Sequence, residues 1–73
     1  MKSANDILEF LAKAWAEDRT LNVRITDEFS VNHEENYINI MDYYNTQSSP
    51  QLKGLDRWRL WRFGTFHEAM HIL

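Results

Sequence analysis

The sequence predicts a small α+β domain with its elements in the order α-β-β-α. Apolar residues recur with the period of a helix near the N-terminus, alternate with period two in the middle, and cover nearly all sides of the last segment. We therefore expect a small antiparallel sheet of two or three strands, packed against an N-terminal and a C-terminal helix. The 73 residues, 44% hydrophobic and 14% aromatic, suffice for one domain and are too apolar for a disordered chain.

The N-terminal helix is expected from Ala4 to about Asp18. Ser3 is a suitable N-cap, and Asp6 places a carboxylate in the first turn, where it favours the helix dipole. The apolar stripe that identifies the helix consists of Ile7, Leu8, Leu11, Ala14 and Trp15. A stripe of this kind is typical of a core-facing helix.

A β-hairpin is expected next. Its first strand is LNVRIT, residues 21–26, where β-branched and polar residues alternate. Phe29 and Val31 keep the same parity, so this strand can continue past an interruption at residues 27–28. After a polar break at residues 32–36, the second strand is YINIMDYY, residues 37–44.

The C-terminal helix is expected from Leu55 to the end of the chain, after a polar loop at residues 45–54. Ser49 and Pro50 offer an alternative start as N-cap and first helical residue. Because the helix is apolar nearly all round, we expect it to be buried on most sides. Gly64 indicates a kink, a break between two helices, or a close approach of another backbone.

The charge distribution indicates pairing within the molecule. Net charge is -3, with five acids and no Lys or Arg between Asp27 and Asp42, and four of the eight basic residues between Lys53 and Arg62. We expect the two blocks to pair with each other. An acidic protein repels phosphate, which argues against a nucleic-acid partner, although RWRLWRF interleaves arginine with aromatic residues as single-strand binders do.

Other classes of site and location are excluded by composition. Without cysteine there is neither a disulfide framework nor a thiolate zinc site, and no glycine-rich phosphate loop is present. No apolar run is long enough to span a membrane, and Asp6 and Glu9 interrupt any signal-peptide pattern. We expect no membrane partner and a cytoplasmic protein.

The segment FGTFHEAMHIL, residues 63–73, carries the strongest chemical signal. His67 and His71 are spaced i, i+4, so on a helix both imidazoles can bind one zinc ion. Glu68 lies beside the first ligand, where its carboxylate can act as general base towards a water that attacks a peptide bond. The predicted metal ligands are His67 and His71, and the predicted catalytic residue is Glu68.

These eleven residues resemble the active-site helix of the zincin metallopeptidases, which contains HExxH in an uncharged setting. The resemblance implies zinc-dependent peptide hydrolysis, a peptide or protein substrate, and a third ligand after the motif, where this sequence stops at Leu73. Residues 1–73 are then a single small domain or the N-terminal fragment of a longer metallopeptidase. With two ligands, zinc would be held weakly or not at all, and the chain alone would be inactive.

Two alternatives remain open. His33, Glu34 or Glu35 could close the metal site from the hairpin turn. Otherwise the motif is incidental, and Thr65 with Glu68 forms a capping box at the start of a short helix.

The partners implied also divide into two. In the resembled family an edge strand near the motif helix binds substrate as an added strand, which makes residues 37–43 a candidate cleft wall. The competing class is a small non-enzymatic protein-interaction module, which forms a homo-oligomer through the hairpin edge or the C-terminal helix.

Overall fold

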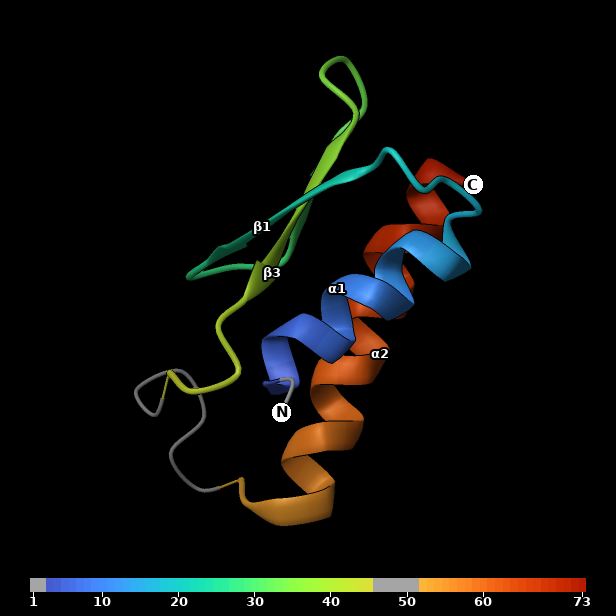
Figure 1. Cartoon of the computed structure of the whole chain (residues 1–73). Helices are drawn as coiled ribbons and strands as arrows, with labels where there is room; N and C mark the ends of the chain where they lie inside the picture. The colour runs from blue at the N-terminus through green and yellow to red at the C-terminus, as the bar shows by residue number, and fades with distance from the viewer. Residues whose placement is uncertain (1–2, 46–51) are drawn as a thin grey trace.

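Two helices pack on one face of a three-stranded sheet, as Figure 1 shows for the computed structural model. The structure describes residues 3–45 and 52–73. In chain order the elements are α1 (Ala4–Trp15), β1 (Asn22–Thr26), β2 (Ser30–Asn32), β3 (Tyr37–Met41) and α2 (Gly54–Ile72). The predicted α+β class, with a helix at each end of the chain and a small sheet between, is confirmed. The alternative helix start at Ser49 and Pro50 lies outside the described residues.

Helix α1 begins where the sequence predicts and ends earlier. The hydroxyl of Ser3 accepts a hydrogen bond from the Asp6 amide, and the Asp6 carboxylate accepts one from the Ser3 amide, each at 3.2 Å. The helix was expected to reach about Asp18, but it ends at Trp15. Glu17 adopts a left-handed φ of 55°, and the Asp18 amide donates to the Lys13 carbonyl at 3.1 Å. This is a Schellman ending, which stops the helix by satisfying its last carbonyls.

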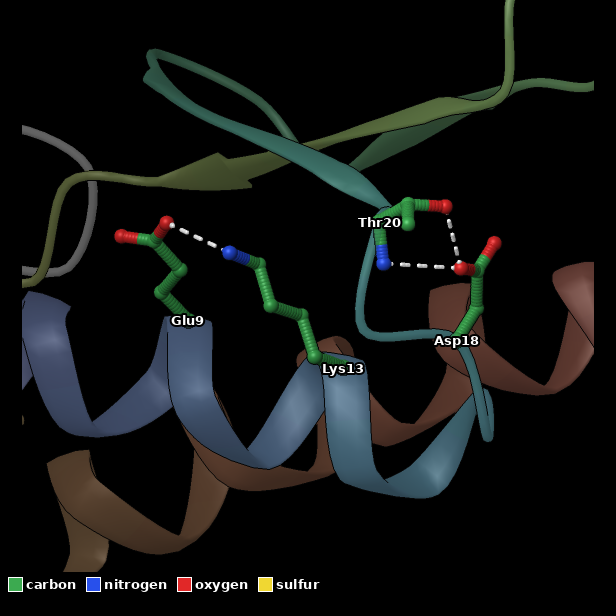
Figure 2. Close-up of polar contacts among 4 residues, drawn as sticks. All are labelled: Glu9, Lys13, Asp18 and Thr20. Atoms are coloured by element: carbon green, nitrogen blue, oxygen red, sulfur yellow. Dashed lines mark hydrogen bonds and ion pairs between the residues drawn. The ribbon is translucent and has the colours of Figure 1, made fainter.

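Local polar contacts hold the turn that follows α1. The Asp18 carboxylate accepts hydrogen bonds from the amide and the hydroxyl of Thr20, at 2.9 and 2.7 Å (Figure 2). A hydrogen bond from the Asn36 side chain, followed by those from Thr20, lowers the pKa of Asp18. Figure 2 also shows the ion pair between Lys13 and Glu9 on α1, at 3.4 Å.

The sheet is mixed, whereas a wholly antiparallel sheet was expected. Its order is β1-β3-β2, with β2 antiparallel and β1 parallel to the central strand β3. The hairpin is therefore β2–β3, and the interruption at residues 27–28 separates two strands. Parallel pairing aligns Val23 with Ile38 and Ile25 with Ile40, so the apolar parity of β1 matches that of β3.

The core lies between the sheet and the helices. Leu8 of α1, Leu21 before β1, Ile38 and Ile40 of β3, and Trp61 of α2 are all at most 1% exposed. The indole Nε1 of Trp61 donates to the Met41 carbonyl at 2.7 Å, which satisfies the polar atom of this buried ring. This bond joins the middle of α2 to the end of the central strand.

Helix α2 is continuous through Gly64 and buries only one face. Its buried residues follow an i, i+4 row: Arg57, Trp61, Thr65 and Ala69. The expectation of burial on most sides was wrong, because one small sheet and one helix cover one side of α2. Gly64 marks a close approach by a side chain: a Cβ there would lie 2.9 Å from Cζ of the Phe29 ring.

Arg57 links the start of α2 to the segment after β3 by hydrogen bonds. Its guanidinium donates to the backbone carbonyls of Tyr43 and Asn45, and it lies 4.6 Å from the Trp61 ring centroid. The pKa of Asp42 is lowered mainly by a hydrogen bond from the Asn5 side chain, and the Arg57 charge is the smallest cause, so Arg57 interacts only weakly with this member of the acidic block.

Candidate metal centre

His67 and His71 converge on the last two turns of α2. Their Nε2 atoms lie 3.3 Å apart, and their ring centroids are separated by 4.9 Å at an interplanar angle of 81°. Both side chains are exposed. The i, i+4 spacing therefore brings the two rings together on one side of the helix, as the sequence predicts.

The nitrogen separation can be compared with that of a zinc site. Bonds of about 2.0–2.1 Å at a tetrahedral angle put two zinc-bound nitrogens about 3.3–3.4 Å apart. The observed distance of 3.3 Å between Nε2 of His67 and Nε2 of His71 fits this requirement. A hydrogen bond between the two neutral rings, with one protonated at Nε2, has a similar length. The nitrogen separation is thus compatible both with a shared zinc ion and with a hydrogen bond between the rings.

Glu68 is half-buried beside the histidine pair, and its carboxylate has no hydrogen bond or ion pair with the described part of the chain. The alternative of a capping box was wrong, because Thr65 lies in the interior of α2. Thr65 is fully buried, and its Oγ1 has no hydrogen-bond partner among residues 3–45 and 52–73. Glu68 is therefore available for proton transfer, as a general base must be.

A third ligand does not converge on the pair in the present side-chain positions. Within residues 3–45 and 52–73, no group of three or more His, Asp or Glu side chains is placed to hold a metal ion. The nearest additional imidazole is His33, in the turn after β2, whose ring centroid lies 6.3 Å from that of His71. Of the three turn residues considered from sequence, His33 is the one with a contact to the motif.

Helix α2 packs against both β3 and β2, and of these two only β2 lies at an edge of the sheet, which corrects the cleft wall expected at residues 37–43. Strand β3 is central and pairs on both sides, so it has no free edge, whereas β2 is at the edge of the sheet. Phe29, before β2, packs on Gly64, and His33, after β2, lies beside His71. Strand β2 therefore runs along α2 towards the histidines. The shared parity of Phe29 and Val31 signalled this strand, but its place in the sheet was missed.

The outer face of α2 is apolar and exposed. Phe63 is 68% exposed and Phe66 42%, and Trp15 of α1 meets Phe66 edge to face at 5.3 Å. These rings, together with Arg59 and Arg62, line an open hollow on the surface. Neither arginine lies within ion-pair distance of a carboxylate in the described residues, so the expected pairing fails for them.

Comparison of the chain with known protein families, with curated proteins and with solved structures finds no match. No helix in the described part of the chain is long and apolar enough to cross a membrane. Function must therefore be argued from the geometry of the site.

Proposed function

We propose that this chain is a fragment or minimal domain of a zinc-dependent metallopeptidase of zincin type. The observation that carries the proposal is the 3.3 Å separation of the His67 and His71 nitrogens on a continuous helix. Both Nε2 atoms thus lie where one zinc ion can bind them. The free carboxylate of Glu68 supports the same reading.

Each residue of the motif has a defined role in this proposal. His67 and His71 would hold zinc through Nε2, which would leave Nδ1 of each ring to carry the proton. Zinc bound there would supply a Lewis acid that polarises a peptide carbonyl and makes water a better nucleophile. Glu68 takes the proton of the attacking water and passes it to the leaving amine. With two protein ligands we expect weak zinc binding and little peptidase activity.

The substrate in this proposal is an extended peptide paired with the free edge of β2. Strand addition supplies main-chain hydrogen bonds without a sequence requirement, and β2 runs beside α2 towards the histidines. The peptide would then pass close to His71. A cytoplasmic location belongs to the same proposal.

A zinc titration followed by NMR of the histidine ring signals tests the metal site, with His71→Ala as the control variant. We expect the His67 and His71 rings to shift together at micromolar to millimolar zinc, and the variant to lose the joint response. Independent titration of the two rings with no response to zinc would refute the proposal.

A second function is favoured by the exposed aromatic face of α2: self-association of this chain as an interaction module. Phe63, Phe66 and Leu60 expose 68%, 42% and 42% of their surface on one helix. Rings of this size gain free energy when a second copy covers them.

Analytical ultracentrifugation tests the association. Phe63→Ser should shift the chain to monomer, whereas Phe10→Ser, a change of an equally exposed ring on α1 (65%), should leave the association intact. A strict monomer at high concentration in the wild type excludes this second function. An oligomer that neither variant affects points instead to the free sheet edge.

A further inference from the structure

His33 lies next to the motif although it is distant in sequence. It occupies the turn between β2 and β3, its side chain is exposed, and its ring meets that of His71 edge to face, at an interplanar angle of 84°. Figure 1 shows this turn and the last turns of α2 at the same end of the molecule. All three histidines of the chain therefore gather at one place.

The ring distances show how far His33 is from a metal bound by the pair. A zinc ion lies about 3.2 Å from the centroid of an imidazole that binds it, so two rings on one tetrahedral zinc have centroids about 5 Å apart. His67 and His71 meet this value at 4.9 Å, and His33 is at 6.3 Å from His71. Relative to His71, the His33 ring is about 1 Å too far, a distance that rotation of an exposed turn side chain can cover. Because His33 has no described contact with His67, the same rotation must also bring it towards that ring.

We propose that His33 is the third ligand of the zinc site, and that its ring turns towards His67 and His71 when the metal binds. This inference rests on the proposed zinc site. Three imidazoles with one open position form the ligand set of a catalytic zinc. Glu34 and Glu35 are in the same turn, but neither has a described contact with the histidine pair, which favours His33 over them.

Binding of His33 to the metal would also have a structural consequence. A bond from His33 to the metal would tie the β2–β3 turn to the C-terminal turn of α2, next to the strand edge proposed to bind the peptide. Zinc should therefore slow amide exchange in residues 33–36 as well as in the last turn of α2. A site made by His67 and His71 alone protects the helix and not the turn.

The test is a zinc titration of the full 73-residue chain by calorimetry and NMR, with the variants His33→Ala, Glu34→Gln and Glu35→Gln. Amide spectra of each variant establish that the fold is retained, as expected for exposed positions. We expect His33→Ala to weaken zinc binding on the order of 100-fold, and the two glutamine variants to bind as the wild type does. Cobalt(II) in place of zinc gives an independent measurement, since its absorption reports the coordination geometry and should change in His33→Ala if His33 is a ligand.

The outcomes separate this inference from the proposed function. If His67 and His71 respond to zinc while His33→Ala binds with wild-type affinity, the pair binds zinc and His33 is not a ligand. If a glutamine variant weakens binding and His33→Ala does not, a carboxylate is the third ligand. If no ring responds in the wild type, the zinc site itself is refuted.

Discussion

The fully buried hydroxyl of Thr65 gives the sharpest test of how α2 is built. A buried hydroxyl without a hydrogen bond costs about 1–3 kcal/mol, and Oγ1 of Thr65 has no partner among the described residues. Valine has the same branched shape, stiffness and similar helix propensity. Thr65→Val should therefore raise the free energy of unfolding by about 1–2 kcal/mol.

The assay is urea unfolding followed by tryptophan fluorescence. With a slope of about 1 kcal/mol per molar urea for so small a domain, the midpoint should rise by about 1–2 M. The matched control is Thr20→Val, which should lower stability, because the Thr20 hydroxyl donates to Asp18 at 2.7 Å. The His67 and His71 response to zinc should not change in Thr65→Val.

The opposite sign would refute the reasoning. If Thr65 capped a short helix, its replacement by Val would remove the cap and lower stability by about 1 kcal/mol. A fall of that size would mean that α2 breaks at Gly64. This one substitution thus distinguishes a continuous α2 from a short helix that begins at a Thr65 cap.

Three further predictions follow from the packing. Gly64→Ala should destabilise the fold in urea despite its better helix propensity, because the new Cβ would lie 2.9 Å from the Phe29 ring. Arg57→Lys should cost about 1–3 kcal/mol in the same assay, since an ammonium cannot reproduce the fork that serves two carbonyls. A hydrogen bond from the Asn5 side chain is the largest cause of the lowered Asp42 pKa. The ionised Asp42 carboxylate therefore stabilises the folded state above pH 3.8, and this contribution is lost as pH falls through the lowered pKa. Asp42→Asn should flatten this part of the acid unfolding curve.

Local signals in the sequence predicted the elements well. Ser3 and Asp6 fixed the start of α1 through hydrogen bonds between residues three apart. Alternation located β1 and the start of β3, but β3 ends at Met41 and not at residue 44, and β2 is a separate strand. The end of α1 was harder to predict from the sequence, because it depends on a left-handed backbone at Glu17. Gly or Asn adopts this conformation more often than Glu. Periodicity identified the apolar residues of α2 but not which of them would be covered.

The order of the strands required the folded structure. A hairpin prediction pairs strands that are neighbours in sequence. In the structure β1 pairs with β3, although β2 lies between them in the sequence. The choice depends on which arrangement places Val23 beside the buried Ile38, on the face that the helices cover. That choice moved the free edge from residues 37–43 to β2, and with it the proposed binding site for a peptide.

By itself the sequence determined the helical and strand periods, the class of the fold, and the spacing that puts His67 and His71 on one side of a helix. These depend on residues a few positions apart, whose geometry a regular backbone sets. Only the tertiary structure decided that α2 continues unbroken through Thr65 and that the edge strand next to α2 is β2. It also decided that His33 lies next to His71. Such contacts join distant segments, and burial of a shared apolar core selects them.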